Sequence, residues 1–257
     1  MTTYKEVTEL SGDEVSEEQV QRIFHRYMWA ANKAKDLDVL EVACGTGQGL
    51  GALLKVAKSL DAGDYSDQIL DIARDYYKDR ISLQQFDAQS MPYETDSKDL
   101  IIIYEALYYI PNIESFINEC KRVLRKNGKV LIATANRDLE DFNPSPHSFE
   151  YLGVEGLNNA FSSKDFSCSF FGYLEVEKIS LRQKVLRPIK KLVVDLGLMP
   201  KTMAGKKLLK RLVFGKLTKM PFEIIGNEFD YEEPQEIKQI KPNADFKVIY
   251  CEARLNN

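Results

Sequence analysis

The amino-acid sequence predicts an α/β fold, in which helices cover both faces of a mainly parallel sheet. Between residues 37 and 135, short apolar runs typical of buried strands alternate with segments that carry apolar residues at helical spacing. Such alternation indicates parallel strands joined by right-handed crossovers. Acidic residues also recur at or near the ends of four of these strands, where sheets of this kind bind their ligands.

The centre of this pattern is a glycine-rich turn. An apolar run over residues 37–43 is followed by glycines at positions 45, 47 and 49, and helical spacing resumes at Leu50. Glycines permit positive φ and let a ligand approach the backbone closely, and the amino-terminal end of the next helix offers free N–H groups. The order therefore predicts a nucleotide-like ligand over the turn.

The glycine spacing excludes two common nucleotide sites. A dinucleotide-binding turn needs its third glycine at position 50, where this chain has leucine. A phosphate-binding P-loop needs a Gly-Lys-Ser/Thr ending, and none follows. An NAD-dependent reductase is therefore disfavoured.

The other elements follow in order. A capping box at Ser16 and Gln19 predicts a helix that begins at Ser16 and ends near Ala30. It is either a packing helix or a lid whose Arg26 and Tyr27 close over the ligand. After the glycine turn, a helix is expected from Gly49 to about Lys58. Further strands are expected over 59–63, 81–86, 100–104, 129–135, 166–173 and 245–254, and helices from Ser66, over 113–124 and over 153–161. The helix from Ser66 is expected to bury Ile69, Ile72, Ala73 and Tyr76.

These elements suggest an N-terminal helical lid over residues 1–36 and a main domain over 37–257, interrupted by a basic helical insertion at about 175–243. The chain has a net charge of −4, yet residues 178–219 contain thirteen lysines and arginines and a single acid. Within that segment, residues 206–213 alternate pairs of leucine or valine with pairs of basic residues. Three interpretations stay open: a solvated helix, a surface for an anionic membrane or a phosphorylated substrate, and a nucleic-acid site, which the acidic remainder of the chain disfavours.

The composition also bears on membrane insertion, secretion, disulfides and metal binding. No apolar run has the roughly 20 residues that a membrane span needs, and the polar N-terminus has no secretory pattern. The four cysteines are far apart and form no C-x-x-C pair, and there are only two histidines. We therefore expect reduced thiols, a cytoplasmic location and no metal site. The oligomeric state is not readable from the sequence.

Two acids at strand ends suit a nucleoside. Asp64 ends the second strand, where a carboxylate accepts hydrogen bonds from ribose hydroxyls; it could instead be an ordinary acid at a helix N-terminus. Asp87 with Ala88 ends the third strand, where the carboxylate and a backbone amide suit an adenine; the alternative is an Asx turn.

These residues together carry a family resemblance over roughly residues 16–174. The stretches Gly45-Thr46-Gly47-Gln48-Gly49, Asp64-Tyr65-Ser66 and Asp87-Ala88-Gln89-Ser90-Met91-Pro92 resemble the motifs of the small-molecule class I S-adenosylmethionine-dependent methyltransferases. The turn at residues 122–128 also resembles the family. Two positions depart from its pattern, since Ala43 and Lys129 stand where glycine is usual.

The resemblance implies a doubly wound, Rossmann-like sheet of seven strands, the last antiparallel, with the helical insertion before that last strand. It implies S-adenosylmethionine as cofactor, with Glu41 near its amino-acid part. The expected cofactor-binding residues are Tyr27, Glu41, Gly45, Gly47, Asp64, Tyr65, Asp87, Ala88 and Glu105.

The predicted function is methyl transfer to a small-molecule acceptor, either anionic or linked to a sugar or lipid. The candidate catalytic residues are His147, in a proline-rich loop, and Glu105, which ends the fourth strand beside several tyrosines. Glu105 could instead hold the donor's amino group. Transfer to oxygen or to nitrogen is left open, and so is the alternative that the protein binds the cofactor without turnover, as a regulatory or scaffold protein.

Overall fold

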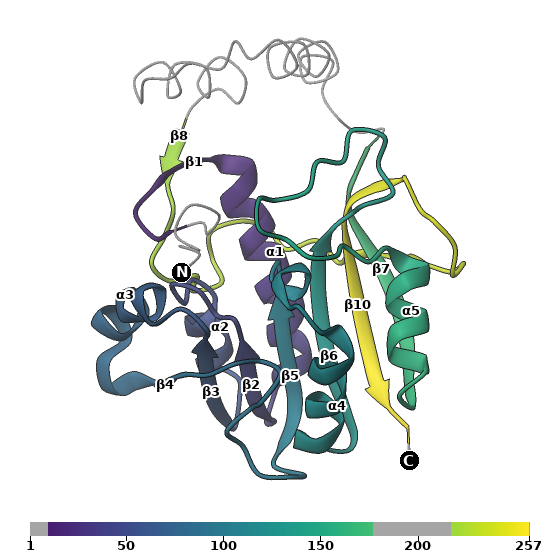
Figure 1. Ribbon diagram of the computed structural model, residues 1–257. Helices are drawn as coiled ribbons and strands as arrows, with labels where there is room; N and C mark the ends of the chain where they lie inside the picture. The colour runs from purple at the N-terminus through teal and green to yellow at the C-terminus, as the bar shows by residue number, and fades with distance from the viewer. Residues whose placement is uncertain (1–9, 177–216, 257) are drawn as a thin grey trace.

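The computed structural model describes residues 10–176 and 217–256. A central sheet runs through the molecule, with helices on both faces (Figure 1). The strands are β1 (Glu14–Ser16), β2 (Asp38–Val42), β3 (Ser59–Asp64), β4 (Ser82–Gln85), β5 (Lys98–Tyr104), β6 (Leu124–Ala135), β7 (Phe166–Glu175), β8 (Leu217–Lys219), β9 (Gln235–Ile237) and β10 (Phe246–Leu255). The α-helices are α1 (Glu17–Ala34), α2 (Leu50–Leu54), α3 (Asp67–Tyr77), α4 (Ile113–Val123) and α5 (Val154–Ser162), with short 3-10 turns η2 (Lys78–Arg80) and η3 (Leu107–Tyr109).

The sheet has the strand order β4-β3-β2-β5-β6-β10-β7-β9. Strands β2, β3, β4, β5 and β6 pair in parallel, whereas β10 is antiparallel to both β6 and β7. The seven predicted strands are therefore confirmed, and so is the antiparallel last strand. The short β9 adds an eighth strand at the edge, antiparallel to β7, which the sequence pattern did not predict.

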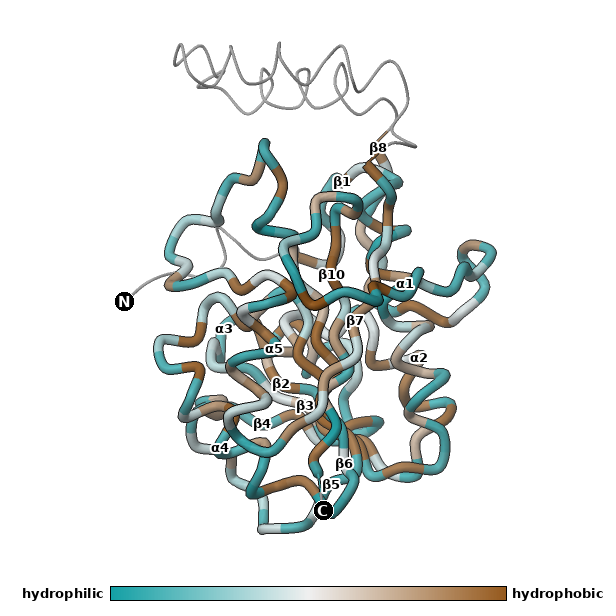
Figure 2. The backbone as a smooth tube through the Cα atoms, turned by 90° about the vertical axis from the view of Figure 1, so that its right-hand side faces the viewer, coloured by the Kyte–Doolittle hydropathy of each residue, from teal (hydrophilic) through white to brown (hydrophobic). Residues whose placement is uncertain are grey.

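The two faces of the sheet bury separate cores because side chains alternate along each strand. On β5, Ile101 and Ile103 face the core under α4 and α5, whereas Leu100 and Ile102 face the core under α1 and α2. Figure 2 shows hydrophobic residues concentrated along the central strands between these layers. The cores hold the strands rigidly, so their carboxyl ends form a fixed edge.

Helix α1 begins as predicted. The Gln19 amide donates to the Ser16 hydroxyl at 3.3 Å, and the Ser16 amide donates to the Gln19 side chain at 3.0 Å. This is the expected capping box. The helix continues to Ala34, four residues beyond the predicted end.

Two helix predictions were inaccurate. Helix α2 ends at Leu54 rather than near Lys58, because the chain turns back to the sheet and the Lys58 amide donates to the Leu37 carbonyl at 2.9 Å. Helix α3 buries Leu70 and Tyr77 beside Ile69 and Ala73, in place of the predicted Ile72 and Tyr76. The Tyr77 hydroxyl donates to the Gly47 carbonyl at 2.8 Å, which fixes the helix in this rotation.

Only part of the predicted insertion lies within the described residues. From residue 217 onward it contributes β8, which pairs antiparallel with β1, and then β9. The predicted basic helix at 206–213 lies outside the described residues. Over the described ranges, no helix is both long enough and apolar enough to cross a membrane.

Candidate functional site

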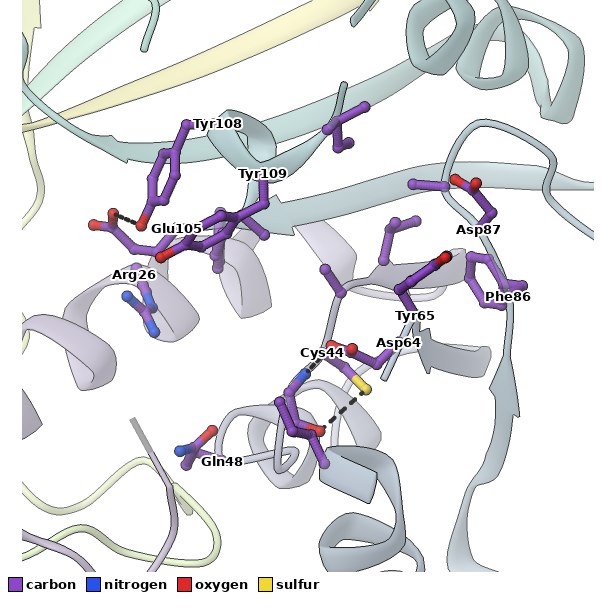
Figure 3. A pocket seen from close by; sticks show the side chains of 18 of the residues that line it. Arg26, Cys44, Gln48, Asp64, Tyr65, Phe86, Asp87, Glu105, Tyr108 and Tyr109 are labelled. Atoms are coloured by element: carbon purple, nitrogen blue, oxygen red, sulfur yellow. Dashed lines mark hydrogen bonds between the residues drawn. The ribbon is translucent and has the colours of Figure 1, made fainter. Parts of the chain in front are cut away.

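A cavity of about 380 Å³ opens at the carboxyl ends of β2, β3 and β5, with α1 along one side. Figure 3 shows Asp64, Tyr65, Phe86 and Asp87 on one side of it and Arg26, Glu105, Tyr108 and Tyr109 on the other. The predicted site residues that line this cavity are Tyr27, Gly45, Asp64, Tyr65, Asp87, Ala88 and Glu105. Residues from five separate elements therefore meet at the edge where the sequence pattern placed a ligand.

The glycine turn needs its glycines for two reasons. Gly45 and Gly47 have φ of 60° and 80°, in the left-handed region that side chains disfavour. Gly49 is required by space, because a Cβ there would lie 2.0 Å from the Tyr27 ring. Ala43 also has positive φ, at 56°, which explains why this position is usually glycine.

Asp64 fixes the turn from the neighbouring strand. Its carboxylate accepts hydrogen bonds from the Gly45 amide at 2.9 Å and from the Ser66 amide at 2.8 Å. Desolvation raises the pKa of Asp64, although these amide hydrogen bonds oppose the rise. The Ser66 side chain makes no cap hydrogen bond, so the carboxylate satisfies the helix terminus in its place. Asp64 thus joins the glycine turn to the start of α3 and also lines the cavity.

Asp87 forms the Asx turn considered as its alternative. Its Oδ1 accepts from the Gln89 amide at 2.8 Å, and the Gln89 side chain donates to both carboxylate oxygens. Asp87 and Ala88 line the cavity next to the Phe86 ring. The turn therefore holds an acid and an apolar surface together at the far end of the cavity.

Glu105 is held by three partners. Its carboxylate lies 3.5 Å from the Arg22 guanidinium, accepts the Ala135 amide at 3.1 Å, and accepts the Tyr108 hydroxyl at 3.3 Å. The residue has φ of 50°, so the strand ends in a sharp turn that brings this side chain to the cavity. Burial raises the pKa of Tyr108 well above its usual value, which keeps that hydroxyl protonated as a donor.

Helix α1 supplies one wall. Arg26 and Tyr27 line the cavity, and Tyr27 is also buried in the core, so the lid and the packing interpretations both stay open. Gln19 and Arg22 line it as well and were not among the predicted residues. A signal for them is present in the sequence, because positions 19, 22 and 26 fall on one helical stripe beside the apolar one.

Two predicted cofactor residues lie just behind the lining. Glu41 is 1% exposed and accepts a hydrogen bond from the Tyr27 hydroxyl. Gly47 is buried, and its carbonyl accepts the Tyr77 hydroxyl. Glu41 thus supports Tyr27, which lines the cavity, whereas Gly47 contacts Tyr77, which does not line it.

The predicted catalytic histidine is not among the lining residues. His147 is exposed, and its loop is tethered to the cavity wall at its neighbours, because Ser145 hydrogen-bonds to Tyr109 and the Phe149 amide donates to the Tyr108 carbonyl at 2.8 Å. In this structure His147 therefore does not join Glu105, and its catalytic role stays a prediction.

Comparison with known proteins agrees with this geometry. Residues 40–132 match the model of a methyltransferase domain family. A probable S-adenosylmethionine-dependent methyltransferase of Mycobacterium tuberculosis is 30% identical over 111 residues, which is 43% of this chain and 40% of the relative. The chain thus spans about two fifths of the length of the curated relatives of this kind that it matches.

Solved structures show the same fold. YcgJ from Bacillus subtilis aligns with a TM-score of 0.58 at 15% identity, over 91% of this chain and 99% of that one. The [4+2]-cyclase SpnF aligns with a TM-score of 0.58 at 15% identity, over 97% of this chain and 88% of that one. A fold shared with a cyclase does not fix the reaction, so the matched domain and its motifs carry the assignment.

The glycine turn, Asp64 and Asp87 meet in one cavity, and the matched region spans all three. Residues 40–132 therefore match a methyltransferase domain, and relatives that share this part of the chain are S-adenosylmethionine-dependent methyltransferases.

Proposed function

We propose that the protein transfers the methyl group of S-adenosylmethionine to a small-molecule acceptor bound in the same cavity. The observation that carries this proposal is the continuity of the cavity. It joins the glycine turn, Asp64 and Asp87 to a second end formed by Glu105, Tyr108 and Tyr109.

The cofactor supplies a methyl carbon that its sulfonium already activates, so the protein's task is to align two molecules and keep water out. We assign the nucleoside to the end with Asp64 and Asp87, whose carboxylates can accept from ribose hydroxyls and an exocyclic amine. Tyr65 and Phe86 offer ring surfaces there. Tyr27 and the glycine turn hold the amino-acid part.

Glu105 is our candidate for the residue that meets the acceptor. Its carboxylate can accept a proton from an acceptor hydroxyl or ammonium, while Arg22 and the Ala135 amide hold it in place. Tyr108 stacks on Tyr151 with ring centroids 4.0 Å apart, which gives this end a flat aromatic wall. Whether oxygen or nitrogen receives the methyl group follows from the acceptor.

Arg22 and Arg26 favour an anionic acceptor at this end, as the sequence suggested, and the basic segment at 178–219 favours one linked to a sugar or lipid. We also propose that the protein is cytoplasmic and makes peripheral contact with anionic membrane.

The test is a calorimetric titration with S-adenosylmethionine and with NAD, followed by transfer of a labelled methyl group to a panel of acceptors. The panel consists of phosphorylated sugars, glycolipids and neutral counterparts of each. Binding of S-adenosylmethionine without NAD binding, together with transfer to at least one acceptor, supports the proposal. Cofactor binding with no transfer to any acceptor favours the regulatory or scaffold alternative.

A further inference from the structure

Glu41 is a buried carboxyl directly behind the cavity wall. It is the next-to-last residue of β2, and the following residues, Val42 and Ala43, line the cavity. One carboxyl oxygen accepts the Tyr27 hydroxyl. The other, Oε2, is buried and has no hydrogen-bond partner among the residues that the structure describes. A buried carboxylate with one oxygen unsatisfied is costly, so this group calls for an explanation.

A second buried oxygen, on a neighbouring strand, also lacks a hydrogen-bond partner among the described residues. Tyr104, on β5, lines the cavity, and within the described ranges its hydroxyl has no hydrogen-bond partner. Its ring packs edge-on against Tyr27 with centroids 5.4 Å apart. Tyr27 therefore contacts two residues that each carry a buried, unsatisfied oxygen, Glu41 and Tyr104.

The surroundings of Glu41 disfavour its charge. Burial, assisted by the negative charge of Asp64, raises the pKa of Glu41 to about 7, although the Tyr27 hydrogen bond and the positive charge of Arg26 oppose the rise. The titratable and charged groups around it come from every neighbouring element: Arg26 and Tyr27 on α1, Cys44 after β2, Asp64 on β3, Tyr77 on α3 and Tyr104 on β5. Only Arg26 in this set is a cation.

A cationic ligand changes this balance. S-adenosylmethionine carries a sulfonium, and its amino group is a second cation when protonated. A positive charge brought into a water-poor cavity beside a buried carboxyl stabilises the carboxylate strongly, since the interaction is little screened.

We propose that Glu41 is a proton-linked positioning residue, which keeps a proton in the ligand-free protein and releases it to solvent when the cationic end of S-adenosylmethionine enters the cavity. The proposal rests on the cofactor binding of the proposed function. One proton leaves the carboxyl as the cation arrives, so the charge inside the site changes little. Glu41 acts on the cofactor through Tyr27 and the field in the cavity, without touching the reacting atoms.

Proton release makes affinity depend on pH and on the charge of the ligand. Below pH 7 the affinity for S-adenosylmethionine falls as the acidity rises, by up to about tenfold per pH unit, because the proton competes with the cation. The demethylated product lacks the sulfonium, so it releases less proton. The protein therefore prefers the donor over the product more strongly on the alkaline side of this range.

The experiment is calorimetric titration with S-adenosylmethionine at pH 6.5, 7.0 and 7.5 in buffers of different ionisation enthalpy, which measures the protons exchanged on binding. In the wild type we expect release of about half a proton at pH 7, since Glu41 is then half protonated. The release should increase toward pH 6.5. The demethylated product, titrated in parallel, should release less.

Two variants separate Glu41 from the ligand's own titration. Glu41→Gln cannot exchange a proton, so whatever exchange remains belongs to the ligand's amino group and is subtracted. Tyr27→Phe removes the hydroxyl that favours the carboxylate, so its release curve should move to higher pH. Circular dichroism confirms that each variant is folded.

The outcomes are distinct. Equal proton exchange in the wild type and Glu41→Gln overturns the inference while leaving cofactor binding intact. If Glu41→Gln does not fold, wild-type exchange that does not vary between pH 6.5 and 7.5 overturns it alone. No binding heat with S-adenosylmethionine in the wild type overturns the proposed function as well.

Discussion

At the scale of single residues, Ala43 shows how a departure from the family pattern becomes visible as backbone geometry. An alanine at φ 56° is strained relative to glycine, which adopts this region freely. We expect Ala43→Gly to raise the free energy of unfolding by up to about 1 kcal/mol, measured by urea denaturation. The control is Ala73→Gly in the ordinary helix α3, which should lower it. Loss of stability at both positions would contradict the assignment of strain to Ala43.

Asp64 gives a second residue-scale prediction. Its carboxylate orders the glycine turn through Gly45 and is expected to accept the cofactor's ribose hydroxyls. Asp64→Ala should reduce affinity for S-adenosylmethionine roughly ten- to hundredfold, as expected for lost hydrogen bonds to a charged acceptor. Titration calorimetry on the folded variant checks this, with Asp67→Ala, an exposed acid on α3, as control. An unchanged dissociation constant for Asp64→Ala would refute the ribose role.

Glu41 predicts how the stability of the ligand-free protein varies with pH. Its pKa is near 7 in the folded state and near 4.5 when unfolded, so the folded state binds more protons between these values. Its contribution therefore becomes unfavourable as pH rises from 4.5 to 7, by up to about 3 kcal/mol. Urea unfolding of Glu41→Gln across this range should lack that fall. Parallel pH profiles for the two proteins would show that Glu41 ionises normally.

The position of a residue at the cavity could be predicted where it follows from local order. Asp64 and Asp87 could be placed because each ends a strand, and parallel strands align their carboxyl ends. Arg22 could not, because its neighbour Glu105 lies 83 positions away and only the packing of α1 across the strand ends brings them together. His147 failed to reach the cavity in this structure for the same reason, since a loop's position after a strand does not fix its path.

At the scale of elements, the segment over residues 220–229 acts as a strap across the glycine-turn side of the molecule. The Ile224 amide donates to the Gln48 carbonyl at 2.6 Å, and Glu223 contacts the Arg80 guanidinium at 2.6 Å and the Tyr76 hydroxyl at 2.9 Å. Gln48 also lines the cavity. The strap therefore supports the turn from outside.

We expect Glu223→Gln to loosen this strap more than it destabilises the fold. The Arg80 side chain is half exposed, so the ion pair contributes about 1 kcal/mol or less to the free energy of unfolding. Limited proteolysis should nevertheless cut the strap faster in the variant. Glu236→Gln, an exposed acid on β9, serves as the control and should be cut at the wild-type rate. Equal cleavage in all three proteins would show that Glu223 does not fasten the strap.

The type of each helix or strand was easier to predict than the residues at which it ends. The apolar period identified α2 and α3, yet α2 is cut short by the hydrogen bond that returns the chain to β3, and α3 is rotated by the contact of Tyr77 with Gly47. Both corrections arise from tertiary contacts, which a local pattern does not contain. The three-residue strands β1, β8 and β9 are too short to give any alternation.

At the scale of the whole molecule, charge is divided unevenly. Residues 178–219 carry thirteen basic side chains, against an acidic remainder. The amphipathic basic stretch at 206–213 lies outside the described residues, so the prediction rests on sequence. We expect the wild type to float with anionic vesicles at low salt, and less so at physiological salt, where screening is stronger.

The matched variant replaces four basic residues by glutamine: Lys206, Lys207, Lys210 and Arg211. In the flotation assay this variant should remain in the fraction that is not bound to vesicles. Neutral vesicles should bind neither the wild type nor the variant. Wild type that ignores anionic vesicles at low salt removes the membrane interpretation. A variant that keeps full activity on the true acceptor would make the segment an ordinary solvated surface.

The pairing of β1 with β8 has a consequence for the order in which the molecule is built. Glu14 pairs with Lys219, a partner synthesised roughly 200 residues later, so this contact closes a very long loop. The strands β2 to β6 pair with one another within residues 38–135, so they can assemble while the rest is still being translated. The start of α1, with its cavity-lining side chains, waits for the chain to emerge past the strap. A nascent polypeptide can thus form the parallel part of its sheet before the start of α1 is fixed, whereas β10 joins between β6 and β7 only later.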